Sequence, residues 1–291
     1  MTDGGIECFL AVCHYKTISK AADTLFITQS SLSTKLKNLE TELGGALFHR
    51  RRGSREMVLT TAGQRFYELA LQHEELHRKM LRVCKTGRQQ LRVSSLNSLG
   101  TYLLPEVYDR FMEQHPEIDL QIQDMEVEAA SRSLLSGHTD IAFISGKTDS
   151  PRLVQTPVFR EAMAVICSRS LHAEKADFLM LKNYQELYIE WSNTFAKWHQ
   201  KTIGTDHSQL TISIMAHLRQ FLEHKACWSI VPVTVATGLQ KDCPIRILHS
   251  EEPLPFRDIS MLTAEAAPVI DNFTQCLRDT LTAHPEITAL I

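Results

Sequence analysis

The spacing of apolar residues predicts amphipathic helices in the first third of this 291-residue chain. A first helix is indicated by four apolar residues at helical spacing: Ile6, Phe9, Leu10 and Cys13. The stretch from Gln29 to Glu42 repeats the pattern with a stripe formed by Leu32, Leu36, Leu39 and Leu43. Because such a stripe has to be buried, this second stretch is expected to pack against neighbouring helices.

The opposite face of the same stretch is polar and carries one cation and no acid. It consists of Gln29, Ser30, Ser33, Thr34 and Lys37. Short side chains that both donate and accept hydrogen bonds match the base edges of a DNA major groove, and a cation matches the phosphates beside them. The plainer interpretation is a solvated helix face, so the neighbouring elements decide between the two.

Those neighbours favour a DNA-binding arrangement. A short helix, KAADTLF, is expected before the polar-faced stretch, with Ser19 as its N-cap and small Ala21 and Ala22 permitting close helix contact. Thr28 is the expected N-cap of the next helix, and Gly44 ends it. Two helices joined by about three residues, the second with a polar outer face, predict a helix-turn-helix.

Two short strands are predicted next, at 47–48 and 57–59, with a basic turn between them. Four arginines belong to this hairpin: Arg50, Arg51, Arg52 and Arg55. A run of charged residues often forms only a solvent-exposed surface without a specific role. Placed directly after a helix-turn-helix, a wing with this tip is better suited to hold DNA phosphates or to enter the minor groove.

A long helix is predicted from Thr61, where Thr61 and Gln64 fit a capping box. Along it, residues that are apolar except for His73 follow one another at steps of three or four positions: Phe66, Leu69, His73, Leu76, Met80 and Val83. This is the a/d seam of a coiled coil and predicts a dimerisation helix. The helix is expected to end near Gly87, at a domain boundary.

From Gln90 onward the period changes, and short apolar strands alternate with helices of 10–15 residues. This alternation predicts βαβ units and a largely parallel sheet. Residues 1–90 carry 14 Lys+Arg and 9 Asp+Glu, whereas the whole chain has a net charge of −3. A basic N-terminal third on an acidic body is typical of a DNA-binding module joined to a domain that does not bind DNA.

Composition narrows the class of protein further. A hydrophobic content of 43% and a charged content of 22% are ordinary for a soluble globular protein. No basic leader with an apolar stretch and no apolar run of about 20 residues is found, so a soluble cytoplasmic protein is expected, without membrane association. The seven cysteines are scattered and contain no C-x-x-C, which disfavours a disulfide framework or a zinc site.

Residues 16–63 resemble the N-terminal domain of LysR-type transcriptional regulators. The motifs that match are Ala21-Ala22, Leu25, Thr28-Gln29, Ser33, Leu39-Glu40, Leu43-Gly44, Leu47-Phe48-His49-Arg50 and Leu59-Thr60-Thr61-Ala62-Gly63. Ser30 stands where the family often has proline. The resemblance implies that the polar helix face reads the major groove and that the wing arginines hold the DNA backbone.

The same resemblance implies a multidomain fold: a winged helix-turn-helix (residues 1–60), a linker and dimerisation helix (61–87) and a two-lobed α/β effector domain (88–291) similar to type II periplasmic binding proteins. Lobe 1 is expected at about 88–158 and 264–291, and lobe 2 at about 159–263. Leu104-Pro105 and the D-I-A of 140–142 match the first lobe. The family's Gly-x-Gly-Ile is replaced by Lys225, Ala226, Cys227 and Trp228, which places the shape of the cleft in doubt.

Ligands of such folds lie at the carboxyl ends of strands, against helix N-termini. By position, the candidate effector-binding residues are Ser95, Asn97, Ser98, Thr101, Ser145, Trp191, Ser192, Asn193 and Thr194. Helix caps or surface loops are equally good interpretations of each. Glu126 and Glu128 on one side and Lys225 on the other leave the polarity of the cleft mixed.

We therefore expect a transcription regulator that binds double-stranded DNA as a dimer or tetramer, with its DNA binding modulated by a small molecule held between the lobes. RNA polymerase is the further partner expected of an activator, and neither a cofactor, nor a metal, nor an enzymatic activity is expected. One alternative is a thiol-based redox regulator of the same fold, with Cys227 as the first candidate for the reactive cysteine. Another is a solute-binding or enzymatic α/β protein with an N-terminal oligomerisation module, but no phosphate-binding loop, G-x-S-x-G or H-E-x-x-H occurs.

Overall fold

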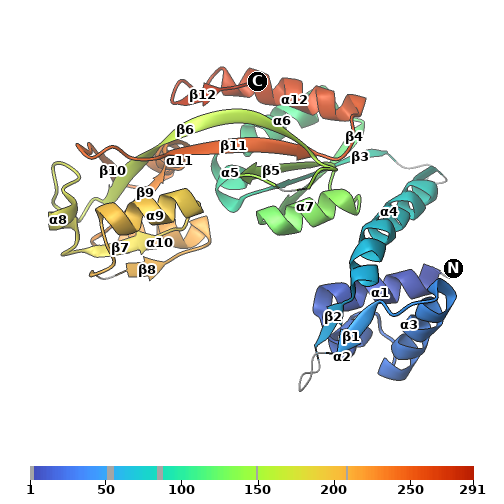
Figure 1. Cartoon of the computed structure of the whole chain (residues 1–291). Helices are drawn as coiled ribbons and strands as arrows, with labels where there is room; N and C mark the ends of the chain where they lie inside the picture. Colours follow the sequence, from blue (N-terminus) through green and yellow to red (C-terminus); the bar gives the residue numbers. More distant parts are fainter. Residues whose placement is uncertain (1–2, 51–55, 84–87, 149, 208) are drawn as a thin grey trace. The chain divides into compact units, whose positions relative to one another are not determined.

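The computed structural model describes residues 3–50, 56–83, 88–148, 150–207 and 209–291. The chain divides into a smaller N-terminal unit, reaching to Thr86, and a larger C-terminal unit. The N-terminal unit contains, in chain order, α1 (Asp3–Tyr15), α2 (Ile18–Thr24), α3 (Gln29–Leu43), β1 (Phe48–Arg50), β2 (Met57–Leu59) and α4 (Thr61–Val83), as Figure 1 shows.

The three leucines at the centre of the α3 stripe are buried, as the spacing predicts: Leu32, Leu36 and Leu39. They form a core with residues of α1 and α2, including Phe9, Ala21 and Ala22. Leu43, in contrast, is 41% exposed. It lies in the last turn of α3, next to Gly44, whose φ of 71° ends the helix in the left-handed region.

Two predicted helix starts are displaced by one or two residues. The N-cap of α2 is Thr17 rather than Ser19, since Thr17 Oγ1 accepts a hydrogen bond from Lys20 N at 3.4 Å. The start of α4 is capped by Thr60, whose Oγ1 accepts from Gly63 N at 2.9 Å. Thr28 caps α3 as predicted, accepting from Ser31 N at 3.2 Å. Neighbouring hydroxyl residues make such starts ambiguous in sequence.

The C-terminal unit alternates strands and helices. Its first half contains β3 (Gln89–Ser95), α5 (Asn97–Tyr102), α6 (Leu104–Gln114), β4 (Ile118–Asp124), α7 (Val127–Leu135) and β5 (Ile141–Ser145). The chain continues through β6 (Val154–Ser168), α8 (Phe178–Leu181), β7 (Gln185–Tyr188), α9 (Asn193–Thr202), β8 (Gln209–Thr211), α10 (Met215–His224), β9 (Cys227–Pro232), α11 (Val233–Asp242) and β10 (Ile245–Leu248). It closes with β11 (Phe256–Thr263), α12 (Pro268–Leu281) and β12 (Ile287–Ala289).

The described strands of this unit form one curled sheet in the order β4-β3-β5-β11-β6-β9-β7-β8, with β10 and β12 also paired to β6. β3 is parallel to β4 and β5, and β7 is parallel to β8 and β9. β6 pairs with β11 through its first half and with β9 from Met163 to Cys167. It therefore runs from one group of strands into the other (Figure 1).

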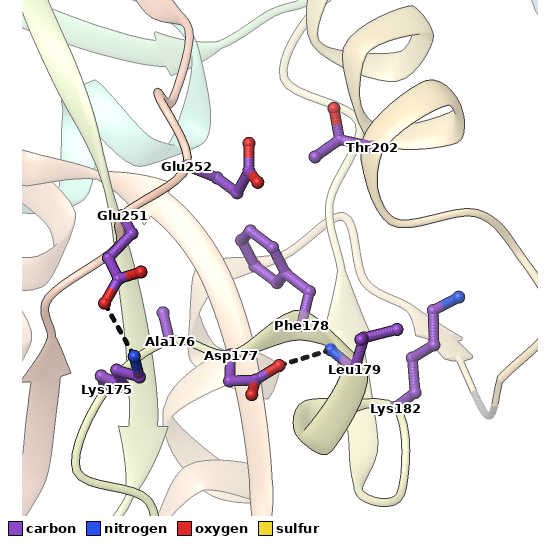
Figure 2. Close-up of a pocket in the computed structure, with 9 residues that line it drawn as sticks. All are labelled: Lys175, Ala176, Asp177, Phe178, Leu179, Lys182, Thr202, Glu251 and Glu252. Carbon is purple, nitrogen blue, oxygen red and sulfur yellow. Dashed lines mark hydrogen bonds and ion pairs between the residues drawn. The ribbon is translucent and has the colours of Figure 1, made fainter.

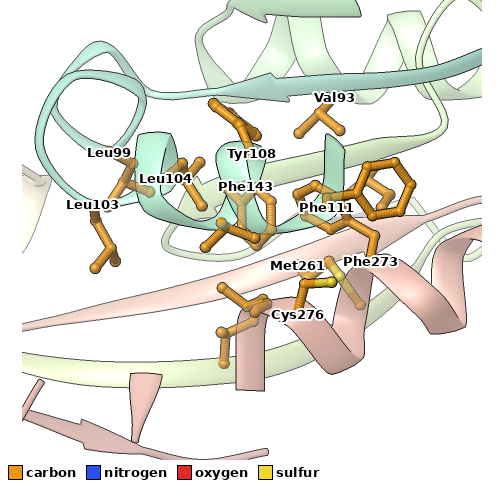
Figure 3. Packing of buried hydrophobic residues seen from close by; sticks show 14 of the residues in the cluster. Val93, Leu99, Leu103, Leu104, Tyr108, Phe111, Phe143, Met261, Phe273 and Cys276 are labelled. Atoms are coloured by element: carbon orange, nitrogen blue, oxygen red, sulfur yellow. The ribbon is translucent and has the colours of Figure 1, made fainter. Parts of the chain in front are cut away.

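We call the two halves lobe 1 (β3–β5, β12, α5–α7 and α12) and lobe 2 (β7–β10 and α8–α11), with β6 and β11 shared between them. The core of lobe 1 combines aliphatic side chains with aromatic rings and includes residues of α6 and α12 (Figure 3). Its rings of Phe111 and Phe273 have centroids 5.4 Å apart. Each lobe thus has a hydrophobic core of its own.

Lobe 2 also buries a carboxylate. Glu186 is 1% exposed, and its two oxygens contact Nε2 of His199 at 2.7 Å and Nε2 of His207 at 2.6 Å. Gln209 Nε2 donates to the second oxygen at 2.9 Å. Burial raises the pKa of Glu186, but these hydrogen bonds outweigh it and leave the pKa below its ordinary value. The ionised carboxylate therefore joins β7, α9 and β8.

Candidate DNA interface and interlobe site

The polar face of α3 is open to solvent. All five residues predicted to read DNA are exposed: Gln29, Ser30, Ser33, Thr34 and Lys37. Gln29 Nε2 donates to Ser19 Oγ at 3.2 Å, and Thr34 Oγ1 donates to the Ser30 carbonyl at 2.9 Å. These bonds orient the side chains while their remaining donors and acceptors face solvent.

The wing is fixed to α3 by an acid. Glu40 Oε1 accepts hydrogen bonds from the backbone amides of Leu47 at 2.7 Å and Phe48 at 3.2 Å. β1 and β2 then pair antiparallel, with Phe48 opposite Leu59. The wing arginines Arg51, Arg52 and Arg55 lie outside the described residues, as does the side chain of Arg50.

The turn between α2 and α3 holds a residue that the sequence did not single out. Phe26 has a φ of 54° and is 96% exposed. A bulky residue in the left-handed region is uncommon, because its Cβ crowds the backbone. The only signal in the sequence is an aromatic residue at a turn position where glycine or asparagine is expected.

The predicted seam of α4 divides into two parts. Phe66 packs on Phe9 of its own unit, with ring centroids 5.0 Å apart, and His73 is half-buried. Three residues of the seam are more than half exposed: Leu69 (59%), Leu76 (57%) and Met80 (54%). The side chain of Val83 lies outside the described residues. An apolar strip on one face of a long helix is suited to pairing with a second copy.

Four of the nine predicted effector residues form two groups. Ser98, which is buried, and Trp191, which is half-buried, both contact Arg257 of β11. Asn97 and Thr101 instead line a groove of about 480 Å³ between α5 and α6 of lobe 1 and α10 and α11 of lobe 2. The structure therefore brings Ser98 of lobe 1 and Trp191 of lobe 2 to one residue, whereas Asn97 and Thr101 lie in a different groove.

The remaining candidates have other surroundings. Ser192 is the N-cap of α9, and its Oγ accepts from Phe195 N at 3.1 Å. Asn193 and Thr194 are exposed on the first turn of α9. Ser95 is buried and its Oγ has no hydrogen-bond partner among the described residues. Ser145 ends β5 and pairs with Ile259 of β11.

Arg257 is the centre of a buried cluster that sequence reasoning missed. It is 4% exposed and stands opposite Glu161 in the pairing of β11 with β6. Its Nη2 donates to Ser98 Oγ at 3.1 Å, its Nη1 contacts Glu161 Oε1 at 3.4 Å, and its Cζ lies 5.1 Å from the ring centre of Trp191. Glu161 Oε2 also accepts from Thr234 Oγ1 at 2.6 Å. Burial raises the pKa of Glu161 and lowers that of Arg257.

α5 makes two further contacts with lobe 2. Asn97 Oδ1 accepts a hydrogen bond from the backbone amide of Met215 at the start of α10. The Tyr102 ring packs so closely on α11 that a Cβ at Gly238 would lie 2.5 Å from Tyr102 Cδ1. Two residues of this short helix, Asn97 and Tyr102, thus contact lobe 2, and a third, Ser98, contacts the shared strand β11.

The segment that replaces the family's Gly-x-Gly-Ile does not fill the cleft with large side chains. Cys227 and Trp228 are both fully buried in the cores of lobe 2, and Trp228 Nε1 donates to the Leu181 carbonyl at 2.9 Å. Burial raises the pKa of Cys227 to about 12. Burial likewise raises the pKa of the other described cysteines: Cys8, Cys13, Cys167, Cys243 and Cys276. Reactive thiols require the opposite shift.

A separate cavity of about 310 Å³ lies beside α8 (Figure 2). Three of its charged side chains have partners: Lys175 Nζ donates to Glu251 Oε1 at 2.7 Å, and Asp177 Oδ1 accepts from Leu179 N at 2.9 Å. None of the predicted effector residues lines it. Across the described chain, no group of three or more His, Cys, Asp or Glu is arranged to hold a metal ion. Of the helices described, none has the length and apolarity needed to cross a membrane.

Comparison with known proteins agrees with this architecture. Residues 5–64 match the family model for bacterial regulatory helix-turn-helix proteins of the lysR family, and residues 85–282 match the LysR substrate binding domain. The transcriptional regulator YofA of Bacillus subtilis is 31% identical over 177 residues, which are 60% of this chain and 61% of YofA. BenM of Acinetobacter baylyi is 31% identical over 163 residues, 55% of this chain and 53% of BenM. The chain thus spans between half and two thirds of the length of these relatives.

Solved structures show the same fold over nearly the whole chain. Full-length OxyR from Pseudomonas aeruginosa superposes with a TM-score of 0.63 at 19% identity, covering 96% of this chain and 95% of that one. Full-length CbnR complexed with its target DNA gives a TM-score of 0.60 at 19% identity, covering 96% of this chain and 100% of that one. They confirm the predicted fold class, an N-terminal helix-turn-helix domain followed by a two-lobed α/β domain.

Proposed function

Since this chain belongs to the LysR family of helix-turn-helix transcriptional regulators, we propose that it binds specific sequences in double-stranded DNA and that a small molecule bound between its lobes modulates that binding. The observation that carries the proposal is the α3 face, where five exposed polar residues stand opposite a buried leucine stripe. Such a face presents hydrogen-bonding groups to base edges while the stripe anchors the helix.

The proposed DNA contacts divide by role. Gln29, Ser30, Ser33 and Thr34 read base edges in the major groove, and Lys37 contacts phosphate. The wing arginines contact the DNA backbone or the minor groove and set the salt dependence of binding. We place the DNA-binding domain at 1–60, the linker helix at 61–87 and the effector domain at 88–291.

The exposed strip on α4 supports assembly. Two α4 helices paired through Leu69, Leu76 and Met80 make a dimer, whose recognition helices enter successive major grooves about one helical turn apart. A pair of such dimers makes a tetramer. Contact with RNA polymerase follows if the protein is an activator. We assign it to the cytoplasm, with no catalytic activity and no cofactor.

Modulation by a ligand requires two states with different affinity for it. The contacts of α5 with α10 and α11 provide a candidate pair of states, with the lobes held together or separated. A ligand that binds one of them better shifts the packing of the lobes and, through it, the spacing of the recognition helices. A redox mechanism is disfavoured, because burial raises the pKa of each described thiol.

The test is capture of genomic DNA fragments by the purified full-length protein at a stated salt concentration. Recovery of fragments that share a two-fold-related motif supports the proposal, and the genes beside them suggest ligands. If a folded, oligomeric sample enriches no sequence, with or without extracts of small molecules, the proposed function is wrong.

A further inference from the structure

Two arginines of the C-terminal unit hold a carboxylate in the same way. Arg92 Nε and Nη2 donate to the two oxygens of Asp140 at 3.0 and 2.6 Å. Arg160 Nε and Nη2 donate to the two oxygens of Asp258 at 2.6 and 3.0 Å. In both pairs the edge of the guanidinium formed by Nε and Nη2 makes two parallel bonds, the geometry in which arginine binds carboxylates most specifically.

The same edge of Arg257 has no carboxylate. Its Nη2 donates to the Ser98 hydroxyl, and its Nε is buried without a hydrogen-bond partner anywhere in the described chain. Glu161 approaches the opposite side, at Nη1, and its distance of 3.4 Å is longer than any bond in the other two pairs. Because buried donors are normally satisfied, this edge is incomplete and matches the two oxygens of one further carboxylate.

This edge of Arg257 lies where residues of both lobes meet. Ser98 belongs to α5 of lobe 1, whereas Trp191 follows β7 of lobe 2 and lies against the face of the guanidinium. Arg257 itself is on β11, which both lobes share. Since its side chain is 4% exposed, a ligand reaches it when the lobes separate. A bound carboxylate would therefore report directly on the arrangement of the lobes.

We propose that Arg257 is the recognition residue for the effector and that the effector is an organic acid whose carboxylate binds Nε and Nη2, displacing the Ser98 hydroxyl. This assignment rests on the proposed function, because it identifies the bound acid with the effector. It goes further in naming the chemical class of the ligand and the atoms that hold it.

The charges around Arg257 favour one carboxylate over a phosphate. Glu161 already balances the guanidinium, and Glu126 adds negative potential nearby. The negative charge of a bound carboxylate is balanced if Glu161 takes up a proton. Its raised pKa makes this protonation easier. A phosphate, with nearly two charges at neutral pH, would exceed what a single proton neutralises. Binding of the acid should therefore be coupled to proton uptake and be tighter at lower pH.

The experiment compares acids with their amides on the full-length protein. The probes are acetate, succinate and phenylacetate, each beside the matching amide, with inorganic phosphate as a further arm. At saturating concentration at least one acid should raise the midpoint of thermal unfolding by about 2–4 °C more than its amide does. The shift should disappear in Arg257→Lys, which keeps the charge but loses the two-donor edge.

Arg160→Lys is the matched control, because Arg160 lies on the partner strand one register position away and on the opposite face of the sheet. It should retain the shift. Glu161→Gln, which removes the competing charge, should enlarge the shift and weaken its dependence on pH. The proposal is overturned if no acid exceeds its amide, if the shift survives in Arg257→Lys, or if phosphate gives the same Arg257-dependent shift. DNA binding of the same samples is measured separately, so loss of the acid response with intact DNA binding contradicts only this inference.

Discussion

Asn97 and Met215 are joined across the two lobes. Asn97 Oδ1 accepts a hydrogen bond from the Met215 amide at 3.0 Å, although 118 residues separate them in sequence. The residue before α10, Ile214, has no side chain that can cap the helix. The first residue of α5 therefore supplies, from the other lobe, the acceptor that the N-terminus of α10 lacks.

Replacing Asn97 by Ala should lower the free energy of unfolding of the C-terminal unit by about 1 kcal/mol, the contribution of a lost helix cap. It should also make separation of the lobes easier, so amide exchange at Met215 should become faster. Chemical denaturation and hydrogen exchange measure the two effects. Asn193→Ala, at the exposed start of α9, is the control. Equal losses in both variants would mean that the interlobe bond contributes nothing specific.

Gly238 should resist a substitution that usually stabilises helices. Gly→Ala inside a helix gains about 0.5–1 kcal/mol when there is space. Here the added methyl group would meet the Tyr102 ring at 2.5 Å, so Gly238→Ala should instead destabilise the protein by about 1–3 kcal/mol.

A double-mutant cycle tests this interpretation. In a Tyr102→Ala background, which removes the ring, Gly238→Ala should become neutral or stabilising in thermal unfolding. If Gly238→Ala is as harmful without the ring as with it, the close packing of α5 on α11 is not what keeps glycine at this position.

His284 gives the C-terminal unit a pH-dependent stability. Its Nδ1 contacts Glu286 Oε1 at 2.8 Å, and its Nε2 contacts Glu106 Oε2 at 3.1 Å. Burial lowers the pKa of His284, but the hydrogen bonds to the two carboxylates outweigh burial and raise the pKa above its ordinary 6.5. The stabilisation is thus fully present below pH 6.5 and is lost as the pH rises through the raised pKa.

His284→Gln should therefore cost about 1 kcal/mol in free energy of unfolding at mildly acid pH and much less at alkaline pH. Unfolding of the variant and the parent at about pH 6 and about pH 9 measures the difference. His172→Gln, an exposed histidine of lobe 2, serves as the control. A cost that is the same at both pH values would show that the histidine acts through packing rather than through charge.

Helical periodicity is local, because it depends only on spacing, and it predicts the buried side chains of α3 for Leu32, Leu36 and Leu39. The fourth residue of the predicted stripe, Leu43, is 41% exposed because the helix ends beside it. Cap positions were less secure, because adjacent hydroxyl residues such as Thr60 and Thr61 offer the same chemistry, and the fold selects Thr60.

The spacing of residues along the sequence does not predict the buried cluster around Arg257. Arg257 meets Glu161 across 96 residues and Ser98 across 159, so no local pattern joins them. Ser98 and Trp191 were identified only because they follow strands in an α/β order. Their contacts depend on how β6 and β11 pair. A single arginine in a predicted strand does not indicate which residues it will contact.

Cys227 should be unreactive in the folded protein. A pKa of about 12 implies a thiolate fraction roughly a thousandfold below that of an ordinary thiol at neutral pH. Mapping of N-ethylmaleimide adducts should find Cys227 modified far more slowly in the native protein than in the unfolded chain. Rapid native labelling, or a disulfide between Cys227 and Cys167 after mild peroxide treatment, would restore the redox mechanism.

The two parts of the proposed DNA interface should respond differently to substitution. Ser33→Ala removes an exposed hydroxyl from the face of α3 and should relax discrimination at one base pair by about 1–3 kcal/mol. Arg51→Ala should weaken binding to all sequences alike and reduce the salt dependence by about one phosphate contact. Fluorescence anisotropy on the captured motif, on single-base variants and over a range of salt measures both quantities. If Ser33→Ala weakens every sequence equally, or Arg51→Ala leaves the salt slope unchanged, the roles assigned to helix and wing are wrong.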